Sequence, residues 1–470
     1  MAVQHPPIES PGSGSAPVGS SPSFTRWIQP TPYDGTPASL TEHAAAIGRV
    51  MAGQGRLWLG PFEAPKALPP GFTHTALVVP TSGSTGAAKA VALTREALLA
   101  SQDATAALFA ADGTAPETQG HGFWLPLLPP THIAGVQIMA RAHRTAQVLG
   151  LDEPALPAQM PDLSGHFDAT AFVTAAEPAL TRTTELGLPA FTSLVPTQLT
   201  RIVTGATGPD ARARALLRRF AAVLVGGAAT RPEILARARA ARIPVRTTYG
   251  SSETAGGCVY DRRALDGVTL AIEEPDHEGA GRLLIASPTL ATGYLRADST
   301  AASDDAIAVV DGTRRLRTSD LARIDDGLLT IIGRADDVII TGGKKVVPQD
   351  VERILERTDM LRDMITGAVV VGVPDPEWGQ RLETVVTIAP WITPAEATPL
   401  VRMALAAAEL PGHMIPKRAH VVEELPLLGI GKIDRSEAQR LAICRAEDPD
   451  APSLVDRVPG PDHLSEPHQD

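Results

Sequence analysis

The sequence predicts an α/β protein: a large N-terminal domain of helix-covered β-sheets with a small barrel-like subdomain, followed by a small α+β C-terminal domain. Three observations predict this fold. The chain has 470 residues, enough for two or three domains. Strand-like apolar runs alternate with helical patterns between residues 75 and 250, which indicates a parallel sheet covered by helices. After about residue 268, short alternating runs indicate antiparallel strands.

The N-terminal elements begin after a tail. Residues 1–25 are rich in Pro, Gly and Ser and are predicted to be disordered. A helix is predicted over residues 39–53, where apolar residues recur at helical spacing: Leu40, Ala44, Ile47 and Met51. A buried strand over residues 75–79 and a helix over residues 94–111 then flank a loop of glycine and hydroxyl residues.

Strands and helices alternate from there to residue 250. Strands are predicted over residues 125–128, 167–174, 189–194, 220–225 and 243–248. One helix is predicted around residues 136–142. Another begins near Thr230 and Glu233, which have capping-box spacing, with Pro232 in the first turn.

The second half of the chain has shorter elements. Antiparallel strands are predicted over residues 268–272, 282–286 and 328–332. A boundary near residues 333–337 divides an N-terminal domain, residues 26–333, from a C-terminal domain, residues 334–445. The latter is predicted to hold helices over residues 348–355 and 399–408 and strands over residues 368–373, 384–388 and 419–422. Residues 446–470 are polar and Pro-rich and are predicted to form a second loose tail.

Composition excludes several classes of protein. A net charge of −11 argues against nucleic acid as the main partner. Two cysteines, Cys258 and Cys444, exclude a disulfide framework, which favours a cytoplasmic location. The sequence has no run of 18 apolar residues and no secretory signal pattern at its start, so we expect neither a membrane span nor secretion.

The loop between the strand over residues 75–79 and the next helix has the composition of a phosphate-binding loop. It reads Thr81-Ser82-Gly83-Ser84-Thr85-Gly86-Ala87-Ala88-Lys89. Glycines let backbone N–H groups approach phosphates, hydroxyls add donors and the lysine adds charge. The spacing differs from that of the common P-loop, and turns use the same residues, so an ordinary surface loop is the alternative.

Three further loops follow predicted strands, where open α/β sheets bind ligands. They cover residues 129–135, 226–229 and 249–254. The last combines an aromatic ring for stacking, hydroxyls for phosphates and the Glu253 carboxylate for Mg²⁺. The alternative for Glu253 is a surface acid.

Three later polar sites are candidates with structural alternatives. Asp320 would ordinarily cap a turn, Gly342-Gly343-Lys344-Lys345 would form a solvated hairpin, and Lys432 would lie exposed on a glycine-flexed loop. No Cys/His cluster has metal-ligand spacing, and neither Gly-x-Ser-x-Gly nor Gly-x-Gly-x-x-Gly after a strand occurs. These absences disfavour a serine hydrolase and a dinucleotide-dependent dehydrogenase.

Taken in order, these segments resemble the adenylate-forming superfamily of acyl- and aryl-CoA synthetases, luciferases and peptide-synthetase adenylation domains. The similarity covers about residues 75–436. Five motifs carry it: the loop from Ser82 to Lys89, Tyr249-Gly250-Ser251-Ser252-Glu253, Thr318-Ser319-Asp320, Gly333-Arg334-Ala335-Asp336-Asp337 with Gly342-Gly343-Lys344, and Gly429-Ile430-Gly431-Lys432.

Within the superfamily, the chain is most similar to the actinobacterial o-succinylbenzoate–CoA ligases of menaquinone synthesis. The similar stretches cover residues 192–199, 248–261 and 373–380. The chain departs from the superfamily pattern at three positions. Ala90 and Ser319 stand where glycine is usual, and Ser252 replaces threonine but keeps the hydroxyl.

The resemblance implies roles for individual residues. Catalytic roles are implied for Lys432, Glu253 and His132, although a packed histidine is the alternative for His132. The residues implied to bind the nucleotide are Thr81, Ser82, Gly83, Ser84, Thr85, Gly86, Lys89, Gly226, Gly227, Ala228, Tyr249, Gly250, Ser251, Ser252, Asp320 and Arg334. The remaining roles are Mg²⁺ binding by Glu253 and Ser252, a hinge at Asp336, a CoA face at Gly342 and Gly343, and substrate contacts by His132, Ser193, Ser251 and Thr254.

The implied reaction uses ATP, Mg²⁺ and coenzyme A. The substrate carboxylate attacks the α-phosphate to give an acyl-adenylate and pyrophosphate, and CoA then displaces AMP after a mobile C-terminal domain rotates. A homodimer is a possible assembly. Two alternatives stay open at this point: another aryl- or acyl-CoA synthetase, and a non-catalytic binding protein of the same fold.

Overall fold

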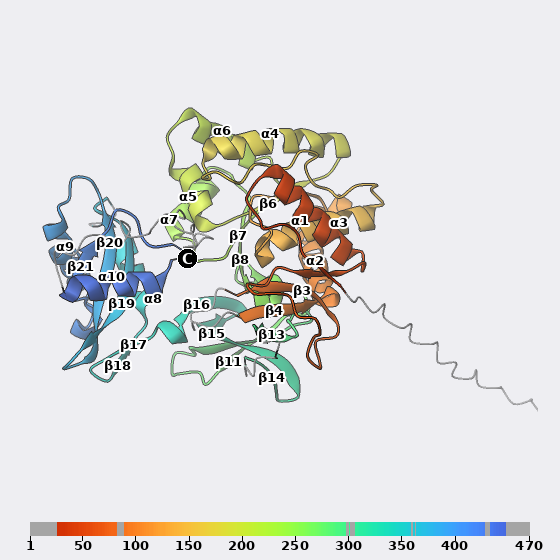
Figure 1. Cartoon of the computed structure of the whole chain (residues 1–470). Helices are drawn as coiled ribbons and strands as arrows, with labels where there is room; N and C mark the ends of the chain where they lie inside the picture. The colour runs from red at the N-terminus through yellow and green to blue at the C-terminus, as the bar shows by residue number, and fades with distance from the viewer. Residues whose placement is uncertain are drawn as a thin grey trace, which may run out of the picture.

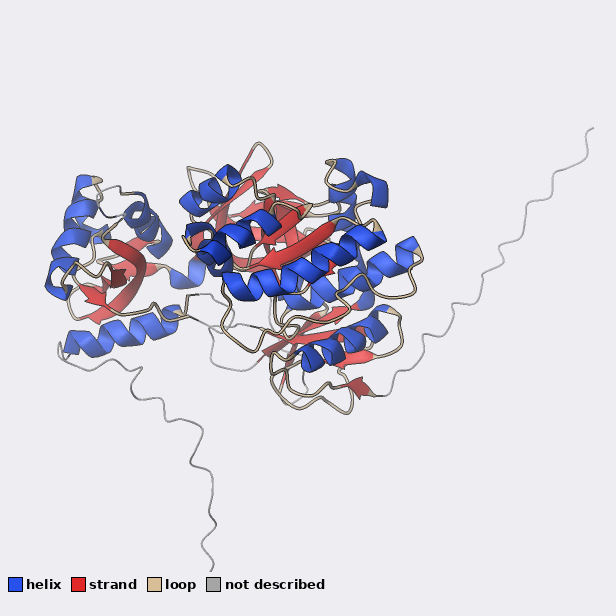
Figure 2. Cartoon of the chain, turned by 90° about the horizontal axis from the view of Figure 1, so that it is seen from above, coloured by secondary structure: helices blue, strands red, loops and turns tan. Residues whose placement is uncertain are grey.

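The structure is a computed structural model that describes residues 26–81, 89–297, 300, 306–358, 361, 363–427 and 433–447. Figures 1 and 2 show a smaller C-terminal domain beside a larger body, in which helices cover β-sheets. This arrangement confirms the predicted fold class. No helix in the described part of the chain has the length and apolar character needed to cross a bilayer.

The first sheet carries the phosphate-loop candidate. Its strand order is β1-β2-β3-β4-β13, with β1 at Trp27–Ile28, β2 at Arg56–Trp58, β3 at Thr75–Pro80, β4 at Lys89–Thr94 and β13 at Gly293–Arg296. Helices α1 (Pro37–Met51) and α2 (Arg95–Ala111) follow threonine N-caps whose side chains accept backbone N–H groups. The strand and the two helices predicted here are confirmed, within a few residues at each end.

The second sheet is the predicted parallel one. Strands β5 (Phe123–Leu125), β6 (Ala190–Leu194), β7 (Ala222–Val225) and β8 (Val245–Ser251) run parallel, and β9 (Gly256–Tyr260) and β10 (Arg263–Ala264) extend the sheet antiparallel beyond β8. Its helices are α3 (Ile133–Leu149), α4 (Ala169–Leu186), α5 (Pro196–Thr204), α6 (Gly208–Leu217) and α7 (Pro232–Ala240).

The strand predicted over residues 125–128 lies instead over Phe123–Leu125, and two other predictions in this region are wrong. Residues 167–174 are not a strand, because Asp168 caps α4 by accepting the Ala171 N–H at 2.7 Å. The buried residues of α4 then follow helical spacing, which outweighs the strand preference of Phe172 and its neighbours. Thr230 does not cap α7, because Pro232 is its first residue and Arg231 therefore occupies the N-cap position.

The third sheet is antiparallel, as predicted. It contains β11 (Thr269–Glu273), β12 (Gly281–Ala286), β14 (Ile307–Val310), β15 (Thr313–Asp325) and β16 (Leu328–Arg334). The long strand β15 pairs with β12, β14 and β16, so it sets the position of Asp320 near its middle.

The C-terminal domain is an α+β unit. Its sheet contains β17 (Ile339–Thr341), β18 (Lys344–Val346), β19 (Ile365–Asp375), β20 (Gly379–Ile388) and β21 (Ala419–Val421), and its helices are α8 (Pro348–Arg357), α9 (Pro394–Ala407) and α10 (Arg435–Glu447). Helix α9 begins five residues before the predicted start, because Thr393 and Glu396 form a capping box and Pro399 lies inside the helix. Helix α10 was not predicted. Its Ala438 and Ala442 share a core cluster with β19 and β20.

The aromatic core behind the parallel sheet gives a stability prediction. Phe191 on β6 is fully buried, with ring centroids 4.9 Å from Phe109 and 5.1 Å from Trp124. We expect Phe191→Ala to lower the free energy of unfolding by about 3–5 kcal/mol, because it removes a large buried ring and leaves a cavity. Urea unfolding followed by tryptophan fluorescence measures this. Val309→Ala, at a 70% exposed position, is the control and should cost under about 0.5 kcal/mol.

Candidate active site

The turn after β8 places Glu253 at an edge of the second sheet. The short helix η2 (Ser252–Thr254) follows β8 directly. Thr254 is fully buried, and its hydroxyl accepts the Ser251 N–H at 2.9 Å and donates to the Gly256 carbonyl at 2.7 Å. A side chain at Gly250 would lie 2.1 Å from the same carbonyl oxygen, so the turn requires glycine. Thr254, which was predicted to contact the substrate, therefore holds the β8 turn together through its hydroxyl group.

Tyr249 and Asp320 meet from different sheets. The Tyr249 hydroxyl donates to Asp320 Oδ2 at 2.6 Å. Burial, followed by the charge of Asp320, raises the pKa of Tyr249, so the phenol stays protonated and acts as the donor. Asp320 pairs in register with Arg334 across β15 and β16, and Arg334 forms a 3.2 Å ion pair with Asp336. The predicted ribose residues and the predicted hinge are therefore neighbours.

Lys89 and Glu253 contact the same tyrosine. The Tyr294 hydroxyl donates to Glu253 Oε1 at 3.0 Å, and Lys89 Nζ lies 5.7 Å from the centre of the Tyr294 ring. Thr81 and Lys89 close the base of the phosphate-loop candidate, where the Thr81 N–H donates to the Lys89 carbonyl at 3.3 Å. The predicted residues of the loop itself, Ser82, Gly83, Ser84, Thr85 and Gly86, lie outside the described residues.

The glycine loop after β7 lies beside the β8 turn, because β7 and β8 are neighbouring parallel strands. A side chain at Gly226 would lie 2.1 Å from the Thr248 hydroxyl, and Gly227 has a φ of +87°. Both positions therefore favour glycine. Gly227 and Ala228 are exposed, which leaves their backbone accessible.

Two predicted substrate residues belong to other elements of the second sheet. His132 is the N-cap residue of α3, and its Nδ1 lies 3.1 Å from the Thr131 hydroxyl oxygen. Ser193 is buried on β6. Helix α3 lies against the β8 turn, since Gln137 Nε2 donates to the Ala255 carbonyl at 2.7 Å.

The hinge segment is linked to the C-terminal domain through Asp337. This residue accepts from Gln349 Nε2 at 2.9 Å and pairs with Arg435 Nε at 3.1 Å, while Arg435 Nη1 also contacts Glu352 at 2.6 Å. Arg435 follows an antiparallel bridge between Leu427 and Ile433, which closes the segment that carries the predicted catalytic lysine. Lys432 itself lies outside the described residues.

Gly342 and Gly343 form the turn between β17 and β18, with φ values of +55° and +75°. The Trp378 ring lies against this turn, so that a side chain at Gly342 would come within 2.6 Å of it. Trp378 is 46% exposed, and sequence reasoning did not assign it to the predicted CoA face.

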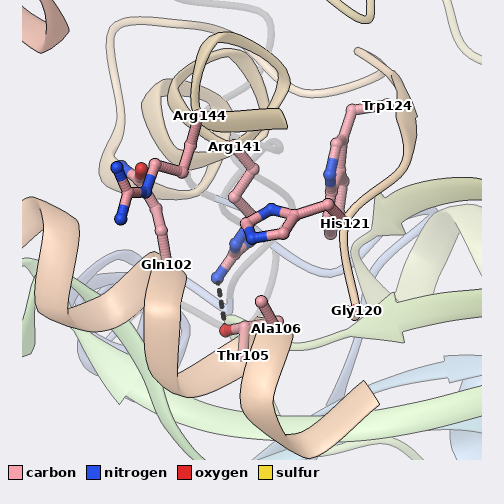
Figure 3. A pocket seen from close by; sticks show the side chains of 8 residues that line it. All are labelled: Gln102, Thr105, Ala106, Gly120, His121, Trp124, Arg141 and Arg144. Carbon is pink, nitrogen blue, oxygen red and sulfur yellow. Dashed lines mark hydrogen bonds between the residues drawn. The ribbon is translucent and has the colours of Figure 1, made fainter. Parts of the chain in front are cut away.

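Sequence reasoning also missed Arg141, which lines the cavity in Figure 3. It is the only lysine or arginine among the described residues whose side chain is buried. Its Nη2 donates to the hydroxyls of Thr105 and Tyr260, both at 3.2 Å, and its guanidinium carbon lies 5.0 Å from the centre of the Trp124 ring. Its Nε has no partner among the described residues. One signal was available: Gln137, Arg141 and Thr145 recur at four-residue spacing in α3.

The cavity beside Arg141 has a volume of about 10 Å³, roughly that of one water molecule. Its other lining residues are Gln102, Thr105, Ala106, Gly120, His121, Trp124 and Arg144. Burial, and next the charge of Arg144, lowers the pKa of His121, so this ring favours the neutral form. Arg144 is partly exposed and forms a 3.0 Å ion pair with Asp103, so the buried positive charge at this point is that of Arg141.

The arrangement of loops around Tyr249, Glu253, Asp320 and Lys89 is that of an enzyme that binds a nucleotide, and comparison with known proteins defines the class. The AMP-binding enzyme model matches residues 29–295, and the model of the AMP-binding enzyme C-terminal domain matches residues 360–432. The probable 2-succinylbenzoate–CoA ligase of Mycobacterium tuberculosis H37Rv is 37% identical over 369 residues, 78% of this chain and 84% of that relative. The chain belongs to the 2-succinylbenzoate–CoA ligase family of AMP-binding enzymes.

More distant relatives and solved structures agree. The 2-succinylbenzoate–CoA ligase of Listeria monocytogenes serotype 4b is 27% identical, over 80% of this chain and 72% of its own length. The Bacillus subtilis o-succinylbenzoate CoA synthetase bound to its acyl-adenylate intermediate has a TM-score of 0.58 at 20% identity, covering 84% of this chain and 80% of that one. ATP-bound MatB from Rhodopseudomonas palustris has a TM-score of 0.61 at 21% identity, covering 86% and 78%. The family resemblance read from the motifs is thus confirmed.

Proposed function

We propose that this enzyme converts 2-succinylbenzoate, ATP and coenzyme A into the CoA thioester, AMP and pyrophosphate, as a step of menaquinone biosynthesis. The observation that carries the substrate is the 37% identity to a probable 2-succinylbenzoate–CoA ligase over 84% of that relative. The loops that converge on Tyr249, Glu253 and Asp320 support a nucleotide at this place. The predicted homodimer and the predicted cytoplasmic location stay predictions.

The first step requires the enzyme to hold two anions together. Because the carboxylate is already a nucleophile, positioning and charge stabilisation dominate over proton transfer. Lys432 bridges the attacking carboxylate and the α-phosphate, and the loop that ends at Lys89 binds the departing pyrophosphate. Tyr249 and the 226–228 loop border the adenine, while Asp320 and Arg334 hold the ribose.

The residues in the β8 turn fit a magnesium ion. Glu253 supplies a carboxylate and Ser252 a hydroxyl, both of them oxygen groups that Mg²⁺ prefers, and one carboxylate oxygen accepts a hydrogen bond from the Tyr294 hydroxyl. When bound, the ion neutralises charge on the phosphates of ATP. Protein ligands are few at such sites because phosphates and water supply the rest.

In the second step the CoA thiol attacks the adenylate and AMP leaves. Rotation about Asp336 withdraws Lys432 and brings the Gly342–Gly343 turn to the adenylate. Asp336 is exposed and belongs to the short helix η3 (Ala335–Asp337) between the third sheet and the C-terminal sheet. The exposed ring of Trp378 beside this turn supplies an apolar face for CoA.

ATP–pyrophosphate exchange across a panel of carboxylic acids tests the proposed function. Succinylbenzoate should support strong exchange, whereas benzoate and fatty acids should support little. Strong exchange with those acids and none with succinylbenzoate would favour a different acyl- or aryl-CoA synthetase. An absence of exchange with every acid would favour a non-catalytic protein.

A further inference from the structure

We infer that Tyr294 is a positioning residue that orients the Glu253 carboxylate with its hydroxyl and seats the Lys89 ammonium with its ring. The inference rests on the proposed function, in which Glu253 holds Mg²⁺ and Lys89 binds phosphate. Tyr294 is only 8% exposed. Its hydroxyl lies 3.0 Å from Glu253 Oε1, and its ring centre lies 5.7 Å from Lys89 Nζ.

Pairing of the backbone fixes the position of this ring. Tyr294 lies on β13, directly opposite Val91 of β4, and Arg296 lies opposite Lys89. Immediately before β13, the Ala291 N–H donates to the Glu253 carbonyl at 2.8 Å. The strand that carries Tyr294 is therefore bound both to the turn that carries Glu253 and to the strand that begins with Lys89.

The Tyr294 hydroxyl has the role of a residue that hydrogen-bonds to a metal ligand and thereby orients it. A hydrogen bond to Oε1 fixes the rotation of the carboxylate and leaves Oε2 for a cation, so the ligand is oriented before the metal arrives. The phenol is neutral and can only donate to an ionised carboxylate, so the contact adds no competing negative charge.

The ring acts on Lys89. An ammonium group within about 6 Å of an aromatic ring centre is attracted to the ring face. This contact limits where the flexible lysine side chain lies at the end of the phosphate-loop candidate. One side chain thus contacts two charged residues from different segments, each through a separate part of its structure.

Two substitutions separate these roles. Tyr294→Phe keeps the ring near Lys89 and removes only the hydroxyl, whereas Tyr294→Leu removes both. Tyr33→Phe is the matched control, because the Tyr33 hydroxyl is buried without a hydrogen-bond partner among the described residues. The readout besides activity is binding of Mn²⁺, measured by electron paramagnetic resonance in the presence of α,β-methylene-ATP.

We expect Tyr294→Phe to raise the apparent Kd for Mn²⁺ about 10–100-fold and to raise the half-saturating Mg²⁺ concentration for exchange similarly. Saturating Mg²⁺ should restore the exchange rate of Tyr294→Phe. The exchange rate of Tyr294→Leu should stay low, because Lys89 has lost its contact with the aromatic ring. Combined with Glu253→Gln, Tyr294→Phe should weaken Mn²⁺ binding no further.

Unchanged Mn²⁺ binding in Tyr294→Phe would overturn the inference, as would a loss that persists undiminished in the Glu253→Gln background. A Tyr33→Phe variant that weakens Mn²⁺ binding equally would also overturn it. The proposed function fails differently: the unsubstituted enzyme would then show no exchange with succinylbenzoate at any Mg²⁺ concentration.

Discussion

Lys432→Ala is expected to slow adenylate formation by about 10²–10³-fold, the usual effect of removing one positioned donor from developing charge. Thioester formation from preformed acyl-adenylate should proceed at a rate near that of the unsubstituted enzyme, because the lysine is withdrawn before that step. Rapid-quench measurements of the two half-reactions separate the effects.

The control for this variant is Lys417→Ala, which removes an exposed lysine of the same domain. Both half-reactions should be unaffected by it. Arg435 lies three residues after Lys432 and forms ion pairs with Asp337, next to the hinge residue, and with Glu352. Neither substitution removes a partner of these ion pairs, so both should be intact in the two variants. An equal loss in the two half-reactions of Lys432→Ala would contradict the assigned role.

Asp336→Pro is expected to reduce thioester formation about 100-fold or more while adenylation stays within about threefold, because proline fixes φ and restricts the preceding residue at the point of rotation. The variant also loses the 3.2 Å ion pair with Arg334. Both residues are exposed, so this loss should matter little.

Asp336→Ala separates backbone from charge. It removes the same carboxylate but leaves φ free, so both half-reactions should stay close to those of the unsubstituted enzyme. If Asp336→Ala is as slow in thioester formation as Asp336→Pro, the side chain rather than the rotation matters. Unaltered second-step kinetics in Asp336→Pro would refute the hinge.

Features of the fold that depend on local signals were predictable. The Thr94 N-cap and the helical spacing of the apolar residues that follow it determine α2. The loop after β7 and the β8 turn contain glycine at positions where close contacts leave no room for a side chain. The strand prediction for residues 167–174 was wrong because a short run of β-branched and aromatic residues fits a strand as well as a buried helix face. Only the Asp168 cap distinguishes the two structures.

The contacts that complete the candidate site were not predictable, because they join distant segments. Tyr294 meets Lys89 and Glu253 only because β13 pairs with β4, about two hundred residues earlier in the chain. Motif order located the nucleotide residues, but the residues that support them required the packed structure.

The central claim is that one enzyme makes an acyl-adenylate and then transfers the acyl group to CoA. Labelled succinylbenzoate mixed with Mg·ATP and excess enzyme, without CoA, tests it most directly. The acid should convert to acyl-adenylate at about one per active site, and added CoA should chase this species into thioester and AMP. Release of ADP in place of AMP, or thioester formed without the adenylate as precursor, would contradict the account.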